Sequence, residues 1–151
     1  MQIRLDDLSG PEIRALLAEH LAGMRSLSPP ESVHALPLDA LRRPDVSFWT
    51  AWSGARLMGC AALKEIEPRH GEVKSMRTAS EHRRSGVARA LLAHLVAEAR
   101  RRRYARLSLE TGAQPAFEPA RRLYHGFGFE YCPPFGSYVD DPHSVFMTLR
   151  L

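Results

Sequence analysis

Apolar positions along the chain follow two periods, and the changes of period mark the predicted helices and strands. From Pro11 to Arg25 apolar residues recur every three or four positions, as on one face of a helix. Ser9 and Glu12 have the spacing of a capping box, and Pro11 suits a first helical turn, so we expect a helix to begin there and to end near Arg25.

The same helical period recurs in three later segments. We expect a short helix over Asp39–Arg43, a long one from Val87 to about Arg102, and one with Pro119 in its first turn. The prolines that follow the first helix predict a loop from Glu31 to Leu38, in which Ser32 and His34 are the candidates for exposed residues.

Strand-type segments, rich in β-branched and aromatic residues, fill the intervals between these helices. They are Gln2–Leu5, Val46–Trp52, Arg56–Glu65, Glu72–Thr78, Tyr104–Thr111, Phe129–Cys132 and Ser144–Leu149. The turn Ser53-Gly54 predicts a hairpin of the second and third. Neither face of Glu72–Thr78 is uniformly apolar, which indicates a bulge or a functional face. The order of elements predicts an α/β (α+β) chain with a mixed, mostly antiparallel sheet.

Length and composition favour one soluble domain. The 151 residues, 44% hydrophobic and 25% charged, suffice for a single core, and no apolar run approaches the roughly 20 residues of a membrane span. The N-terminus lacks the apolar segment of a signal peptide, so a cytoplasmic protein is expected. Cys60 and Cys132 belong to no zinc-type spacing; we expect buried, reduced thiols and no metal.

Positive charge is concentrated in one part of the chain. The segment Arg77–Arg103 contains eight arginines and two acidic residues, whereas the whole chain carries a net charge of +4. Such a patch suits nucleic acid or a polyphosphorylated cofactor. The run Arg100–Arg103 has a simpler explanation as a solvated helix end, where the helix dipole favours positive side chains.

The stretch Arg83–Ala88 joins a predicted strand to a predicted helix and has the features of an anion site. Unpaired N–H groups at a helix start attract negative charge, and Gly86 lets the backbone approach a ligand closely. The stretch lacks the GxxxxGK[ST] of a P-loop and the GxGxxG of a Rossmann turn. A phosphate or pyrophosphate is the expected ligand.

Two ordered motifs resemble those of the GNAT family of acetyl-CoA-dependent N-acetyltransferases. Arg83-x-x-Gly86-x-Ala88 matches the family's [QR]-x-x-G-x-[GA] loop, and Leu123-Tyr124 with Gly128-Phe129 matches its "LY…GF" segment. The resemblance implies a single domain over residues 1–151, with a six- to seven-stranded sheet flanked by about four helices. It also implies an acyltransferase that uses acetyl-CoA as the acetyl donor and no metal.

The resemblance further implies which residues would hold the cofactor. Backbone amides of the loop would cradle the pyrophosphate, with arginine side chains adding charge, and the backbone of the preceding strand would pair with the pantetheine arm in a gap between splayed strands. These expected cofactor residues are Met76, Arg77, Thr78, Arg83, Arg84, Ser85, Gly86, Val87, Ala88 and Arg89.

Acetyl transfer to an amine needs a proton donor for the leaving thiolate and an acceptor for the amine proton. Tyr124 matches the family's usual acid position, although packing in the core is its alternative role. Glu72, eleven residues before Arg83, matches the catalytic base of the histone-acetylating branch. An exposed glutamate at a strand edge is the competing explanation for Glu72, and a water chain to Glu110 or His34 is another route for the proton.

Family comparison places the acceptor between the first helices and the loop before the last strand. The candidate substrate-binding residues are Arg25, His34, Arg77, Phe135 and Tyr138. Because guanidinium groups bind carboxylates, a small amine such as an amino acid is expected. A protein lysine or N-terminal acetyltransferase, and a non-catalytic nucleic-acid-binding module, remain alternatives. The edge of the final strand is a possible homodimer surface.

Overall fold

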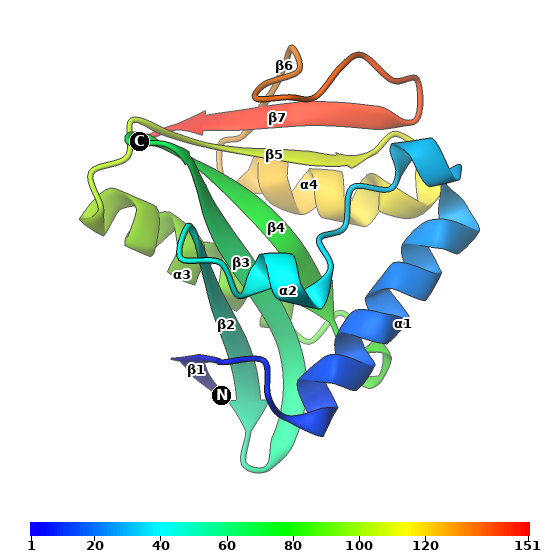
Figure 1. Ribbon diagram of the computed structural model, residues 1–151, viewed down its shortest axis with the longest axis vertical. Coiled ribbons are helices and arrows are strands. Elements are labelled where there is room, and N and C mark those ends of the chain that lie inside the picture. The colour runs from blue at the N-terminus through cyan, green and yellow to red at the C-terminus, as the bar shows by residue number, and fades with distance from the viewer.

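The computed structural model describes residues 1–151 and forms one seven-stranded sheet in the order β1-β2-β3-β4-β5-β7-β6 (Figure 1). The strands are β1 Gln2–Leu5, β2 Val46–Ser53, β3 Arg56–Glu67, β4 His70–Thr78, β5 Arg106–Gly112, β6 Glu130–Cys132 and β7 Ser144–Arg150. All neighbours pair antiparallel except β4 and β5, which are parallel. The predicted fold class is confirmed.

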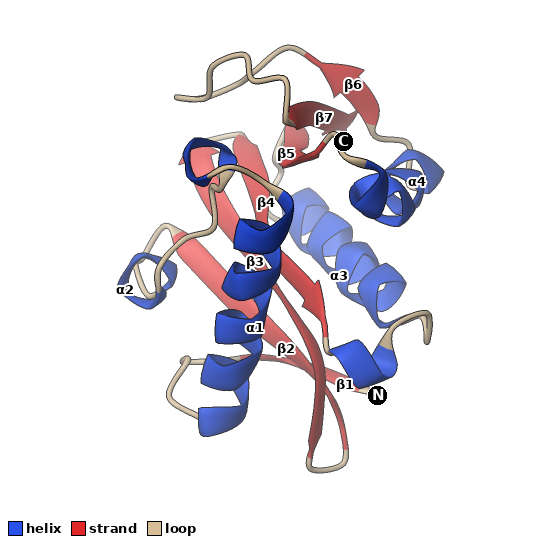
Figure 2. Cartoon of the chain, turned by 90° about the vertical axis from the view of Figure 1, so that its right-hand side faces the viewer, coloured by secondary structure: helices blue, strands red, loops and turns tan.

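Four α-helices cover the two faces of the sheet. They are α1 Pro11–Leu27, α2 Leu38–Leu41, α3 Val87–Arg101 and α4 Glu118–Gly126, with 3-10 turns at Pro30–Ser32, Ser80–His82 and Pro115–Phe117. α1 and α2 lie on one face, and α3 and α4 on the other (Figure 2). No helix is both long and apolar enough to cross a membrane.

Each face has its own apolar core. Under α3 and α4, Leu91, Leu92 and Leu95 pack with Leu107 and Met147, all fully buried. A smaller cluster lies under α1 and α2 and contains Ile13, Leu16, Leu41, Phe48 and Cys60. The helical stripes seen in the sequence are therefore the faces that bury apolar area, which is the main force that holds such layers together.

The strands β4 and β5 separate after a short pairing. Their register joins His70 to Arg106 and ends at Glu72 with Ser108, so the rest of β4 has no strand partner on that side. On its other side β4 pairs with β3, where Cys60 faces Arg77 and Ala62 faces Lys74, an irregularity that inserts an extra residue. The expected gap and the expected bulge are both present.

Several local expectations were wrong. The cap of α1 is Gly10, because the hydroxyl of Ser9 donates instead to Asp7 Oδ1 at 2.6 Å. Ser32 is only 3% exposed.

Two expectations about the C-terminal part also need correction. The final strand β7 lies between β5 and β6, so it offers no free edge; the sheet edges are β1 and β6. Cys60 is fully buried, but Cys132 is only partly so, because it lies on the edge strand β6; both thiols are free.

Candidate active site

The turn before α3 leaves the start of that helix open. Gly86 is its N-cap residue with φ +86°, no side chain caps the helix, and a Cβ built on Gly86 would meet no atom within 4 Å. Arg84, with φ +64°, is also left-handed. Two left-handed residues in a three-residue stretch turn successive backbone N–H groups into a concave cradle, which suits a phosphate.

Basic side chains surround this turn and form no ion pairs. Arg83, Arg84 and Arg89 are exposed. The guanidinium of Arg89 lies 5.7 Å from the centroid of the ring of Phe127, the residue that follows α4. Charge on this rim would add to the attraction of the cradle for a polyanion.

The bulge in β4 gives the backbone next to the gap an irregular course. Ser75 has φ +53°, and Met76 follows it on the strand. The side chain of Arg77 turns to α1, where its Nη2 donates to Glu19 Oε1 at 3.0 Å, and Ser80 donates to the same carboxylate. Arg77 is thus held away from the other candidate acceptor residues, although its backbone borders the gap.

Tyr124 lies on α4 in an almost closed environment. It is 6% exposed, and its ring packs edge-on against Phe129 with centroids 5.8 Å apart. Burial, together with the nearby negative charge of Glu110, raises the pKa of Tyr124 to about 12. The phenol is therefore protonated at neutral pH and able to donate.

Glu72 belongs to a buried polar group that we name the Lys74 cluster, made of Glu72, Lys74, Tyr138 and the backbone of His34. Glu72 is 4% exposed and accepts a hydrogen bond from the Tyr138 hydroxyl at 2.6 Å. Lys74 Nζ lies 3.5 Å from Glu72 Oε2 and donates to Tyr138 Oη at 2.8 Å and to the His34 carbonyl at 3.0 Å. The explanation of Glu72 as an exposed strand-edge residue is wrong.

The Lys74 cluster joins the two loops that were expected to hold the acceptor. The Tyr138 ring lies edge-on to His34 at 5.0 Å and to Phe135 at 5.2 Å between centroids. Ser32 adds a second link, because its hydroxyl donates to Asp141 Oδ2 at 2.5 Å. Three predicted acceptor residues therefore come together. Arg25 does not join them: it is exposed and forms no hydrogen bond or ion pair.

Glu110 is a second carboxyl group on this side of the sheet. Burial raises the pKa of Glu110, whereas the nearby Ser144 hydroxyl and the charges of His34 and Lys74 oppose the rise; the negative charge of Glu72 adds to it slightly. The Glu110 pKa is thus shifted toward neutrality, in the direction expected of a general base. Unlike Glu72, Glu110 has no lysine or tyrosine hydrogen-bonded to its carboxylate.

Lys74 is a functional candidate that the sequence did not single out. A lysine on a strand normally faces solvent, and the only signal against that was the irregular alternation of Glu72–Thr78. Its partner Tyr138 is 64 residues away in the chain, so no local pattern could reveal the pairing.

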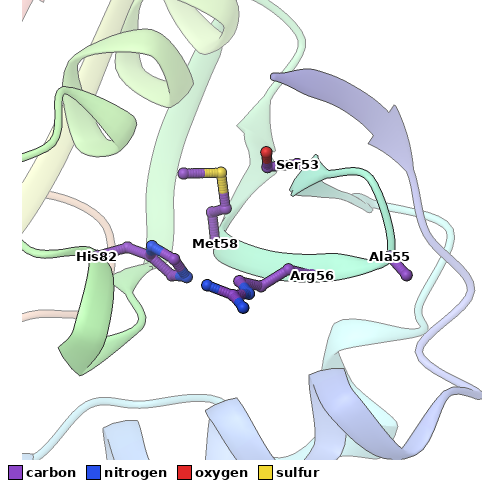
Figure 3. A pocket seen from close by; sticks show the side chains of 5 residues that line it. All are labelled: Ser53, Ala55, Arg56, Met58 and His82. Carbon is purple, nitrogen blue, oxygen red and sulfur yellow. The ribbon is translucent and has the colours of Figure 1, made fainter.

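An open hollow of about 600 Å³ lies next to the turn that precedes α3. Its lining comes from the β2–β3 hairpin and from His82 (Figure 3). The side chains of Arg56 and His82 point toward one another across it, while Met58 lies behind them (Figure 3). The hollow extends the basic surface around the turn.

Two arginines of the run at the end of α3 form hydrogen bonds with nearby side chains. Glu98 accepts hydrogen bonds from both Arg101 and Arg102, and these contacts lower the pKa of Glu98 to about 2. Arg102 also donates to Ser47 Oγ at 2.8 Å. Arg101 and Arg102 thus have partners within the protein, so a nucleic acid is not needed to explain their presence.

The residues present fit a coenzyme A molecule. The turn at Gly86 has space that no protein atom fills, and the gap between β4 and β5 leaves strand backbone unpaired next to it. A diphosphate suits the former and an extended arm with amide groups suits the latter.

Comparison with known proteins gives the same assignment. The model of the Acetyltransferase (GNAT) family matches residues 13–129. The chain is 56% identical over 151 residues to the uncharacterized N-acetyltransferase YsnE of Bacillus subtilis (strain 168), covering 100% of both chains. A solved structure from Klebsiella pneumoniae, classed with the acyl-CoA N-acyltransferases, is 30% identical with a TM-score of 0.80, covering 99% of this chain and 97% of that chain.

A second solved structure shares the fold at lower identity. It is a GNAT family acetyltransferase from Elizabethkingia anophelis with acetyl-CoA bound, 16% identical with a TM-score of 0.70, covering 99% of this chain and 97% of that chain. Taken with the family match over residues 13–129, these similarities show that the chain belongs to the GNAT family of acetyltransferases and is an acyltransferase.

Proposed function

We propose that this protein transfers the acetyl group of acetyl-CoA directly to a primary amine of a small molecule. The observation that carries the proposal is the open, left-handed turn at Gly86 next to the gap between β4 and β5. The fold neighbour from Elizabethkingia anophelis holds acetyl-CoA, which supports the same ligand here. Hydrogen bonds link the two loops expected to hold the acceptor to each other and to Lys74, and we take such a fixed arrangement to favour a small acceptor over a protein chain.

The cofactor would lie along the backbone of the residues already described. Amides of Arg84 to Arg89 would bind the diphosphate, and Arg83 would add charge at the rim. The backbone of Met76 to Thr78 would pair with the pantetheine arm. A backbone N–H near Met76 would then stabilise the oxyanion that forms when the amine attacks.

Two proton transfers accompany the proposed acetyl transfer. The amine nitrogen attacks the thioester carbonyl, a C–N bond forms, the C–S bond breaks, and Tyr124 gives its proton to the leaving thiolate. For the amine proton we propose Glu110 as the acceptor, directly or through water, because its raised pKa suits a base. Glu72, the base suggested by spacing, is engaged by Tyr138 and Lys74, and we assign it to the support of the acceptor loops.

A substitution at Gly86 tests the cofactor site. Gly86→Asp places a carboxylate where the diphosphate would lie, so acetyl-CoA affinity is expected to fall by about a hundredfold or more, because like charges repel at short range. Isothermal calorimetry with acetyl-CoA measures the change.

Gly54→Asp is the matched control. Gly54 has φ +60° and open space around its Cβ position, so the same backbone strain arises in the β2–β3 turn. Acetyl-CoA should bind this control as it binds the wild type. Tight binding of acetyl-CoA by a folded Gly86→Asp protein would overturn the proposed site.

A further inference from the structure

A pocket of about 270 Å³ lies between α1 and the segment that leads into α2. That segment turns back after α1 and runs along it (Figure 1). The α1 side of the pocket is Arg14, Leu17, Ala18, His20 and Leu21, and the facing side is Ala35 to Leu38. Ser75 of β4 is the only lining residue from outside these two segments.

The lining of this pocket is predominantly apolar and carries little charge. The leucines and the proline give it aliphatic walls, and Arg14, which is exposed, directs its Nε to the Leu8 carbonyl at 3.3 Å. Arg77, which lies near His20, is held by Glu19. A carboxylate or ammonium placed among these walls would lose its hydration, which is costly. The lining holds no acidic residue to pair with an ammonium, and Arg14 could pair with a carboxylate only at its exposed end, where an ion pair contributes little.

His20 supplies one polar atom that has no partner. Its Nδ1 is buried and forms no hydrogen bond. Burial, reinforced by the charge of Arg77, lowers the pKa of His20 to about 4, so the ring is neutral at physiological pH. The neutral ring therefore adds no charge to the wall of the pocket.

The pocket reaches the bulge of β4. Ser75, the left-handed residue of the bulge, is part of the lining, and Met76 is the next residue along the strand. A molecule that fills the pocket would therefore end next to the backbone that borders the gap. The pocket therefore lies next to the proposed cofactor site, unlike an isolated groove elsewhere on the surface.

We propose that this pocket receives the body of the acceptor and that the acceptors are primary amines with an uncharged, apolar alkyl or aromatic body. This inference rests on the proposed acetyltransferase function. It replaces the amino-acid-like acceptor expected from the arginines, because Arg25 is absent from the lining and Arg77 is paired with Glu19.

A pair of acceptors tests the proposal on the wild-type protein. The kcat/KM for acetylation of 2-phenylethylamine should exceed that for glutamate and for spermidine by about tenfold or more, since only the first has an apolar, uncharged body. Calorimetry with 2-phenylethylamine, with and without CoA, gives a readout that does not depend on turnover. Preference for glutamate or spermidine would overturn the proposal.

Two variants locate the binding. Leu21→Glu should weaken 2-phenylethylamine binding about tenfold or more by placing a charge in the wall, while acetyl-CoA affinity stays the same. Leu27→Glu is its control, since Leu27 is 45% exposed at the end of the same helix and outside the lining. Because Leu21→Glu also risks the fold, Ala18→Trp offers a second probe: Ala18 is exposed and lines the pocket, so the indole narrows it.

The Ala18→Trp variant has its own control in Ala15→Trp, at an exposed position of α1 outside the lining. Binding of 2-phenylethylamine that is unchanged in a folded Ala18→Trp protein would overturn the assignment to this pocket. Failure of acetyl-CoA to bind the wild type would instead remove the proposed function. Calorimetry of 2-phenylethylamine would still decide whether the pocket takes apolar amines.

Discussion

Tyr124 shows how burial alone prepares a residue for acid chemistry. Its phenol is enclosed by the packing of α4 on the sheet and lies within the influence of the negative charge of Glu110, and both effects keep the proton on the oxygen. The ring also contacts Phe129. A packing role and a catalytic role are therefore compatible in the same side chain, and they differ only in what the hydroxyl contributes.

Removal of that hydroxyl separates the two roles. Tyr124→Phe is expected to lower kcat by about a hundredfold, within the range typical of a lost general acid, and to leave acetyl-CoA affinity and thermal stability nearly unchanged. Steady-state kinetics together with calorimetry measures both quantities. Tyr131→Phe, at a tyrosine 57% exposed, is the control. Equal turnover of Tyr124→Phe and wild type would exclude Tyr124 as the acid.

At the scale of elements, the Lys74 cluster connects β4 to two loops from opposite ends of the chain. Lys74 has 10% of its side chain exposed and Glu72 has 5%, so the pair lies in a region where an uncompensated charge is costly. The same lysine holds the His34 carbonyl and the Tyr138 hydroxyl. The shape of the acceptor side thus depends on one strand residue.

Lys74→Met is expected to lower the free energy of unfolding by about 3 kcal/mol, because it leaves the Glu72 carboxylate buried without its cation. Urea unfolding measures this change. Lys64→Met, at a half-buried lysine of β3 without an ion pair, should be nearly neutral. The double variant Lys74→Met with Glu72→Gln should recover part of the loss, and no recovery would contradict the charge explanation.

The sequence predicted the elements well where one period ran long enough. The apolar stripe of α3 buries one face of the helix, and the apolar runs of β2 and β3 are buried in the middle of each strand, so the pattern and the structure follow from the same cause. The open turn before α3 could also be predicted, because Gly86 and its neighbours are contiguous in the sequence.

The parts that sequence could not predict depend on long-range contacts. Ser32 and Asp141 are 109 residues apart in the chain, and Lys74 and Tyr138 are 64 apart, so only the folded chain brings them together. The capping box at Ser9 failed for a local reason: Asp7 competes for the Ser9 hydroxyl. The role of His20 was not readable, because its burial depends on a segment that follows α1 and packs back against it.

Across the whole molecule, stability should depend on pH through its buried histidines. Burial lowers the pKa of His20 from 6.5, the value for an unfolded chain, to about 4, and it also lowers the pKa of His70. Between pH 4 and pH 6.5 the unfolded chain therefore binds more protons at His20 than the folded chain does. The contribution of His20 to the free energy of unfolding is therefore fully present above pH 6.5 and is lost as the pH falls toward 4.

His20→Leu should flatten this dependence. On acidification the free energy of unfolding of the wild type is expected to fall by up to about 3 kcal/mol through His20 alone. The variant lacks this titrating group, so its free energy of unfolding should fall by correspondingly less. Urea unfolding at a series of pH values measures both slopes. His143→Leu, at an exposed histidine, should keep the wild-type slope. Identical slopes for wild type and His20→Leu would contradict the neutral, buried state of His20.

The separation of β4 from β5 has a consequence for the order of events. The pairing of His70–Glu72 with Arg106–Ser108 is the one strand pairing between the two halves of the sheet, and the Lys74–Tyr138 hydrogen bond also links them. The acceptor pocket lies in the half that contains α1, whereas Tyr124 lies in the half that contains α4. A cofactor in the gap would act as a spacer that sets the distance between them. On this basis the donor should bind first and the acceptor second, because the bound donor would fill the gap that lies between the two groups.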